Sequence, residues 1–125
     1  MSKKILIVDD EPDLVTVLAH RFKTSGYQVE EVSNGQEALK RAKEGNPDLI
    51  IMDVVMSDMS GTEVAAMLAE DLSTKDIPII FLTALQTKKE EQKKGPDVGG
   101  RIVFSKPFEF EELLARTKQL IGQRQ

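Results

Sequence analysis

The sequence has 125 residues, of which 40% are hydrophobic and 30% are charged. This size and composition are typical of one globular domain with a sizeable core. The net charge of -4 argues against direct nucleic-acid binding, which depends on basic surfaces. The absence of cysteine excludes disulfides and thiolate zinc sites, and it suits a cytoplasmic protein.

The chain opens with a short apolar run at residues 4–8 (KILIV), which is typical of a buried parallel strand. The run is too short for the core of a signal peptide or for a membrane span, so no membrane partner is predicted. Residues 11–26 predict a helix that begins at Pro12 and ends at Gly26. Its apolar face has a spacing of four residues, at Leu14, Leu18 and Phe22.

Two further strands and one helix follow. Residues 27–32 (YQVEEV) alternate as a more exposed strand. Asn34 and Glu37 predict a capping box for the next helix, which Gly45 closes. Residues 48–56 (DLIIMDVVM) contain the third strand, whose apolar run leads directly to a carboxylate.

The second half of the chain continues the alternation. Gly61 precedes a third helix whose apolar positions are Val64, Met67, Leu68 and Leu72. Residues 77–83 and 101–108 contain the fourth and fifth strands, and the last helix has an apolar side at Phe110, Leu113, Leu114, Thr117, Leu120 and Ile121. Residues 85–100 carry charges without an apolar stripe, which predicts a solvated short helix followed by a loose glycine loop.

Strands that alternate with helices predict a doubly wound α/β sandwich with a five-stranded parallel sheet covered on both faces. Sites in such sheets form at the carboxyl ends of the strands. Polar residues stand at those ends: Asp9, Asp10 and Glu11 after the first strand, Asp53 at the third, Thr83 at the fourth and Lys106 at the fifth. We therefore expect these side chains to share one cleft.

The chemistry of this set indicates a metal-assisted phosphoryl site. Carboxylates about 4 Å apart repel by roughly 4 kcal/mol at an effective dielectric of about 20. A hard divalent cation relieves that repulsion, and ligands that are all oxygen atoms favour Mg2+. Lys106 can place its charge on a phosphate oxygen, and the Thr83 hydroxyl can donate to another. Asp53 then has the surroundings of a nucleophile that accepts a phosphoryl group.

Each residue also has an ordinary explanation when it is taken alone. Acids after a strand often cap helices, threonine favours strands, and a lysine before proline is normally a solvated turn. Matched chemistry at four strand ends argues against these explanations for the set. His20 is predicted to lie on the surface, and Met52, Met56 and Met59 are predicted to serve packing.

Four segments resemble a known family, the receiver domains of bacterial two-component response regulators, including chemotaxis receivers. The segments are ILIVDDEP, PDLIIMDVVMSDMSG, IPIIFLTA and SKPF. They occur in the same order as in the family, and the resemblance covers residues 1–125 as one receiver domain. The resemblance implies a flavodoxin-like three-layer α/β/α sandwich with strand order 2-1-3-4-5.

The resemblance also implies a role for each matching residue. Asp53 corresponds to the phosphoacceptor, and Thr83 and Lys106 to the catalytic switch residues. Mg2+ is held by Asp9, Asp10 and Asp53 and by the backbone carbonyl of Val55, and the backbone of Ala84 contacts the phosphoryl group. Pro107 corresponds to a structural proline whose preceding peptide bond is usually cis.

The implied partners are those of a signalling switch rather than of a turnover enzyme. A sensor histidine kinase or a histidine phosphotransfer protein donates the phosphoryl group, and an unidentified protein target receives the signal. Phosphorylation-dependent homodimerisation is a further implied interaction. The only reactions expected of the chain are its own phosphorylation and dephosphorylation.

Two features depart from the family pattern. Ser57 stands where a proline is common, so the loop after Asp53 is expected to be less rigid. Val103 stands where an aromatic switch residue is usual, and Phe104 should point to the opposite face of its strand. We therefore expect phosphorylation to act through the order of the connection at residues 84–100.

Two other functions remain open on the sequence. One is a Mg2+-dependent phosphatase with an aspartyl nucleophile, although such enzymes of the haloacid-dehalogenase type normally carry that nucleophile on the first strand. The other is an interaction module that works without phosphorylation.

Overall fold

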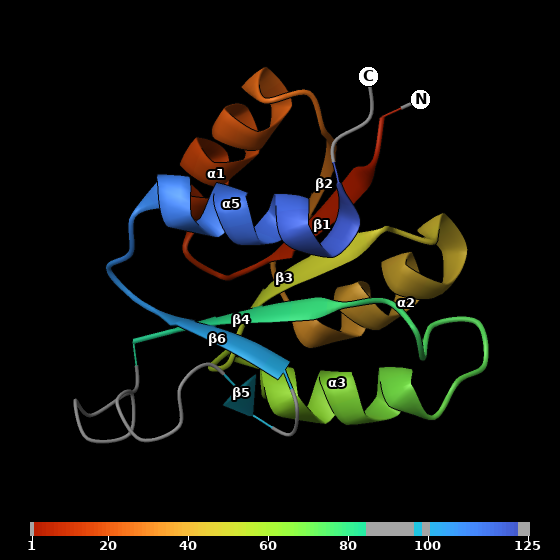
Figure 1. The fold of residues 1–125 in the computed structure, drawn as a ribbon. Helices are drawn as coiled ribbons and strands as arrows, with labels where there is room; N and C mark the ends of the chain where they lie inside the picture. Colours follow the sequence, from red (N-terminus) through yellow and green to blue (C-terminus); the bar gives the residue numbers. More distant parts are fainter. Residues whose placement is uncertain (1, 85–96, 99–100, 123–125) are drawn as a thin grey trace.

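The computed structural model describes residues 2–84, 97–98 and 101–122, which form a three-layer α/β/α sandwich (Figure 1). The long strands are β1 (Lys4–Val8), β2 (Gln28–Val32), β3 (Leu49–Asp53), β4 (Ile79–Thr83) and β6 (Arg101–Ser105). They pair in parallel in the order β2-β1-β3-β4-β6. The predicted doubly wound sheet with strand order 2-1-3-4-5 is confirmed, and β6 is its fifth long strand.

The sheet also has an edge strand that the sequence did not predict. β5 (Asp97–Val98) pairs antiparallel with β6, with Asp97 opposite Ile102 and Val98 opposite Arg101. The expected loose glycine loop is therefore wrong for these two residues, because so short a strand has no alternation to detect. The rest of the connection, including the short helix expected there, lies outside the described residues.

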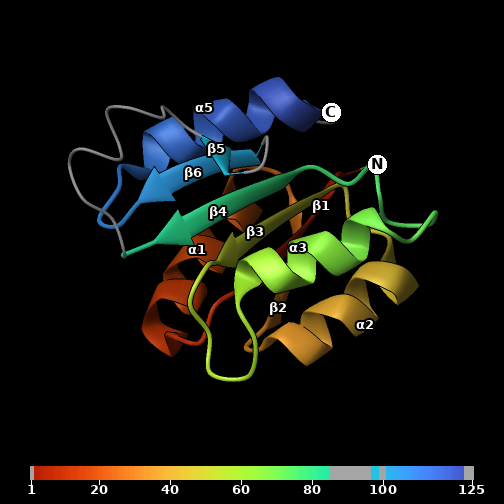
Figure 2. The ribbon, with the colours of Figure 1, turned by 90° about the horizontal axis from the view of Figure 1, so that it is seen from below.

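The described helices cover the two faces of the sheet in pairs. α1 (Pro12–Thr24) and α5 (Phe110–Ile121) lie on one face, and α2 (Gly35–Gly45) and α3 (Gly61–Ala69) lie on the other (Figures 1 and 2). None of the helices within the described ranges is both long and apolar enough to cross a membrane.

The helix ends agree with the predictions in part. Pro12 opens α1, and Gly26 beyond its end has the left-handed φ of 101°. Asn34 caps α2 through a bond from the Glu37 N–H at 2.9 Å, whereas the complete capping box of the described helices joins Ser60 and Glu63 at α3.

Two buried clusters hold the layers together. Along each central strand, alternate side chains enter the cluster under α1 and α5 or the cluster under α2 and α3. Phe22 is fully buried in the first cluster. Met52 and Met56 belong to the second, and Met59 packs against it, so the predicted packing role of these methionines is confirmed. His20 is exposed, as expected.

Three apolar residues that were assigned to helix faces are exposed instead. Leu72 is 84% exposed, Met67 50% and Leu120 37%. For Leu72 the reason is that α3 ends at Ala69, before a turn in which the Asp71 carboxylate accepts bonds from the N–H and the hydroxyl of Ser73. This local side-chain bonding competes with continuation of the helix.

Candidate functional site

Strand alternation brings three charged side chains to one place at the carboxyl edge of the sheet. The ladder continues past β1 and β6, because the Asp9 N–H donates to the Val32 carbonyl at 3.2 Å and the Lys106 N–H donates to the Thr83 carbonyl at 2.8 Å. A residue that packs in the cluster under α1 and α5 precedes each charged residue by two positions. These residues are Ile7 before Asp9, Ile51 before Asp53 and Phe104 before Lys106. The period of two directs all three side chains towards the same side of the edge.

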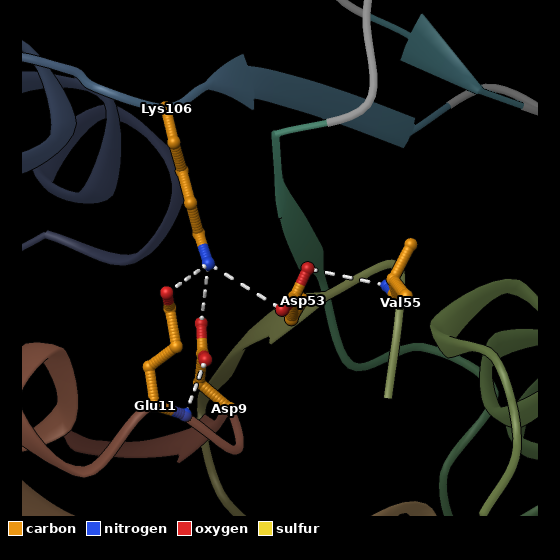
Figure 3. A network of polar contacts seen from close by, with 5 residues as sticks. All are labelled: Asp9, Glu11, Asp53, Val55 and Lys106. Carbon is orange, nitrogen blue, oxygen red and sulfur yellow. Dashed lines mark hydrogen bonds and ion pairs between the residues drawn. The ribbon is translucent and has the colours of Figure 1, made fainter. Parts of the chain in front are cut away.

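The Lys106 ammonium lies between three carboxylates (Figure 3). Its Nζ is 2.7 Å from Glu11 Oε1, 3.0 Å from Asp9 Oδ2 and 3.4 Å from Asp53 Oδ2. Burial lowers the pKa of Lys106. The hydrogen bonds that its ammonium donates to Glu11 and Asp9, together with the charge of Asp53, outweigh burial and hold that pKa above its ordinary value. Lys106 is therefore a fixed positive charge at physiological pH.

Asp53 ends β3 and is 6% exposed. Its Oδ1 accepts a bond from the Val55 N–H at 3.2 Å. Burial raises the pKa of the Asp53 carboxyl and the charge of Asp9 adds to the rise, while the Val55 N–H and Lys106 act in the opposite direction. The Lys106 ammonium thus does not fully offset the effect of burial on the Asp53 carboxyl.

Asp9, Asp10 and Asp53 can each offer an oxygen such that the three atoms lie within 4.8 Å of one another. Asp9 is 2% exposed, whereas Asp10 is exposed to solvent. A cleft of about 280 Å³ opens beside them, lined by Asp9, Asp10, Pro12, Val15, Thr16, Glu31, Val32, Ser33 and Glu37. Hard oxygen donors with excess negative charge are the ligand set that suits Mg2+, so the residues fit this ion.

Thr83 and Ala84 lie at the end of β4, the strand beside β3. Thr83 is 5% exposed and Ala84 is exposed. By alternation Thr83 belongs to the opposite side of the sheet from Asp53, the side of Phe81 and the α2/α3 cluster. The Lys106–Pro107 peptide bond is cis.

Comparisons with known proteins identify the family of the chain. A family model described as "Response regulator receiver domain" matches residues 5–118. The chain belongs to the response-regulator receiver family. Receiver domains are phosphoacceptor switches of two-component signalling, and this chain is one of them.

Individual relatives support the same assignment for this receiver domain. It is 42% identical over 123 residues to the alkaline phosphatase synthesis transcriptional regulatory protein PhoP of Bacillus subtilis, covering 97% of this chain and 49% of that protein. It is 41% identical to the phosphate regulon transcriptional regulatory protein PhoB of Pseudomonas aeruginosa, covering 97% of this chain and 52% of that protein. The chain thus spans about half the length of these curated relatives.

Solved receivers share the fold over nearly the whole receiver domain. The chemotaxis response regulator CheY4 of Vibrio cholerae superimposes with a TM-score of 0.82 at 30% identity, covering 96% of this chain and 99% of that one. The response regulator TrrA of Thermotoga maritima, solved in complex with Mg2+ and BeF, superimposes with a TM-score of 0.80 at 36% identity. The match covers 94% of this chain and 98% of that one.

The side chains at the switch position lie as the strand pattern predicted. Val103 packs against the α2/α3 cluster, and Phe104 belongs to the opposite face, where its ring makes an edge contact with Phe108 at 6.4 Å between centroids. The receiver domain therefore has valine on the side of the sheet to which Thr83 belongs. Most of the connection at residues 84–100, through which we expected the signal to pass, lies outside the described residues.

Sequence reasoning placed Glu11 in the expected cleft without a role of its own, and it did not consider Asp58. Glu11 forms the shortest contact with Lys106, and its only sequence signal was its place as the third acid of the DDE run. Asp58 ties the loop after Asp53 to α2, because its carboxylate accepts bonds from the backbone N–H groups of Gly35, Gln36 and Met59. These bonds lower the pKa of Asp58.

Gly61 is required because the backbone at Asp53 passes very close to it. A Cβ at residue 61 would lie 2.3 Å from the Asp53 carbonyl oxygen and 3.2 Å from Val54 Cα. We expect Gly61→Ala to reduce the free energy of unfolding by about 1–3 kcal/mol, since backbone atoms would have to move. Urea unfolding measures this change. Gly45→Ala is the matched control, because a Cβ there meets only the ends of the Glu30 and Lys4 side chains, at 3.3 and 3.4 Å. Equal losses from both variants would contradict the prediction.

The raised pKa of Asp53 predicts a dependence of stability on pH in the absence of Mg2+. The folded state holds the Asp53 proton more tightly than the unfolded state, so ionisation costs stability as the pH rises from about 3.9 through the raised pKa. Asp53→Asn should therefore be more stable than the wild type at pH 7, and the difference should shrink below about pH 3.9. Urea unfolding of the wild type and of Asp53→Asn at pH 7 and below about pH 3.9 tests the direction of this difference. A variant less stable than the wild type at pH 7 would refute the prediction.

Proposed function

We propose that Asp53 is the residue at which this receiver domain accepts a phosphoryl group. The observation that carries the proposal is the meeting of Asp53, Asp9 and Lys106 from three strands at one nearly buried edge. An Asp53 carboxylate oxygen forms the new bond to phosphorus while the bond from phosphorus to a histidine nitrogen of the donor breaks. The electron pair of that bond stays on the imidazole nitrogen, which then takes a proton.

The other residues position the phosphoryl group and neutralise its charge during this transfer. Mg2+ would be held by Asp9, Asp10, Asp53 and the Val55 carbonyl oxygen, and when bound it would neutralise carboxylate and phosphoryl oxygens. Lys106 attracts one phosphoryl oxygen as a point charge. Thr83 ends β4, the strand beside β3, so we propose that its hydroxyl and the Ala84 backbone N–H donate to phosphoryl oxygens that project beyond the carboxyl edge of the sheet, where its two sides meet. Pro107 fixes the chain after Lys106.

The transfer to Asp53 and the later hydrolysis of the aspartyl phosphate by water are the only reactions that we propose for the chain. The donor is a sensor histidine kinase or a histidine phosphotransfer protein, and the cytoplasm is the location that this donor implies. The output is a change of conformation that an unidentified protein target, or a second copy of the chain, recognises. We propose no direct contact of this domain with nucleic acid, and we propose that residues 1–125 act as one domain.

Intact-mass measurement after incubation with a small-molecule phosphodonor tests the proposal. We expect a gain of one phosphoryl group with Mg2+ and little or none when the metal is chelated. No gain in the presence of Mg2+ would favour an interaction module that works without phosphorylation. Repeated turnover of a generic phosphomonoester would favour the phosphatase.

A further inference from the structure

We propose that Glu11 is a positioning residue that gives the Lys106 ammonium a partner outside the metal-binding carboxylates, so that Mg2+ can compete with the ammonium for Asp9 and Asp53. The inference rests on the proposed metal site, and it concerns a residue to which neither the motifs nor the family match assigns a role. Glu11 would act through Lys106, without touching the metal or the phosphoryl group.

The geometry around Glu11 is the first argument. Its Oε1 is 2.7 Å from Lys106 Nζ, shorter than the 3.0 Å to Asp9 and the 3.4 Å to Asp53 (Figure 3). Glu11 occupies the N-cap position of α1, but its side chain makes no capping bond there. The carboxylate is directed to the ammonium instead.

The backbone of Glu11 supports the same arrangement. Its N–H donates to Asp9 Oδ1 at 2.9 Å, while Asp9 Oδ2 accepts from Lys106. Glu11 thus binds Asp9 through its main chain and the Lys106 ammonium through its side chain. That ammonium is the group that would compete with a metal for Asp9. The backbone bond keeps Glu11 next to Asp9, so its carboxylate is within reach of Lys106 when Asp9 changes partner.

Competition for oxygen atoms is the second argument. An ammonium has three donors, and here they face Asp9, Glu11 and Asp53. Two of these carboxylates belong to the group that can hold a metal, whereas Glu11 does not. A metal on these carboxylates competes with Lys106 for their oxygen atoms, and Glu11 is an acceptor for the ammonium outside that pair.

The consequence is that removal of the Glu11 carboxylate should strengthen the competition. Of the carboxylates that Lys106 contacts, Asp9 and Asp53 would then remain, and Mg2+ would compete with the ammonium at both. Loss of a negative charge near the site also weakens cation binding by itself. The experiment must therefore separate the effect that passes through Lys106 from the effect of the charge alone.

A double-mutant cycle on Mg2+ affinity makes this separation. The dissociation constant of Mg2+ is measured on the unphosphorylated chain by titration of amide NMR signals, for the wild type, Glu11→Gln, Lys106→Gln and the double variant. Glu11→Gln should weaken binding about threefold to tenfold when Lys106 is present. In the Lys106→Gln background the same substitution should have an effect at least about threefold smaller.

Glu31→Gln is the matched control. Glu31 is an exposed acid that lines the cleft beside Asp9 and Asp10, and the described ion pairs of Lys106 do not include it. Its substitution should change Mg2+ affinity by the same factor with and without Lys106. Thermal unfolding verifies that each variant is folded, and Lys106→Met replaces Lys106→Gln if the latter is not.

The outcomes distinguish the inference from the function on which it rests. Equal effects of Glu11→Gln in both backgrounds would overturn the positioning role while the metal site stands. Coupling as large for Glu31 as for Glu11 would also overturn it. Absence of saturable Mg2+ binding by the wild type would overturn the proposed metal site together with the role of Glu11.

Discussion

Asp53→Asn is expected to abolish uptake of a phosphoryl group from a small-molecule phosphodonor in the presence of Mg2+. The amide keeps the size of the side chain, and its oxygen can still accept the Val55 N–H bond seen at 3.2 Å. It lacks the anionic oxygen that forms the bond to phosphorus. The intact mass should therefore remain that of the unmodified chain under conditions in which the wild type gains one phosphoryl group.

Asp76→Asn is the matched control for this experiment. The Asp76 side chain is 88% exposed and forms an ion pair with the neighbouring Lys75. The same change from acid to amide at this surface position should leave phosphoryl uptake at the level of the wild type. If Asp53→Asn still gains the group, peptide mapping will locate another acceptor, with Asp9 and Asp10 as the nearest acids, and the proposed assignment of Asp53 will be wrong.

The sequence predicted the central sheet well because burial leaves a strong pattern there. β1, β3 and β4 are buried along their whole length or nearly so, and continuous apolar runs mark them. The set of strand-end residues followed from parallel topology alone, since parallel strands finish at one edge. Asp9, Asp53 and Lys106 meet there although 97 positions separate the first from the last.

The misses have a common physical cause, which is that local or distant partners overrode a weak pattern. Leu72 continued the apolar spacing of α3, but the bonds of Asp71 to Ser73 favour a turn at that point. β5 is too short to alternate, and it exists through its pairing with β6. By contrast, α2 does end at Gly45 as predicted, and Asn46 after it takes the left-handed conformation, with φ of 46°.

Side-chain partners across the site were the least predictable feature. The contact of Glu11 with Lys106 joins residues 95 positions apart, and no spacing rule selects Glu11 over Asp10 for that role. Asp58 similarly binds backbone groups of α2, 22 and 23 positions away. Both depend on how loops approach each other, which is decided by the packed layers rather than by any periodicity.

Phe22→Ala is the prediction with the largest expected effect on stability. Phe22 is fully buried and joins three parts of the fold, with ring centroids 5.9 Å from Tyr27 and 4.9 Å from Phe110 of α5. Truncation removes the apolar contacts and leaves a cavity between α1 and α5. The expected loss is about 3–5 kcal/mol in the free energy of unfolding, a large share of the roughly 5–15 kcal/mol typical of native proteins.

Urea unfolding of Phe22→Ala and of Val17→Ala tests this prediction. Val17 lies on the same helix but is 55% exposed, so its truncation should change the free energy of unfolding by no more than about 0.5 kcal/mol. The contact of Phe22 with Phe110 adds a second test, because aromatic pairs couple by about 0.5–1.5 kcal/mol. The double variant Phe22→Ala/Phe110→Ala should therefore lose less than the two single losses combined. Strict additivity would show that the rings do not stabilise each other, and a loss from Phe22→Ala as small as that from Val17→Ala would contradict the burial of Phe22 itself.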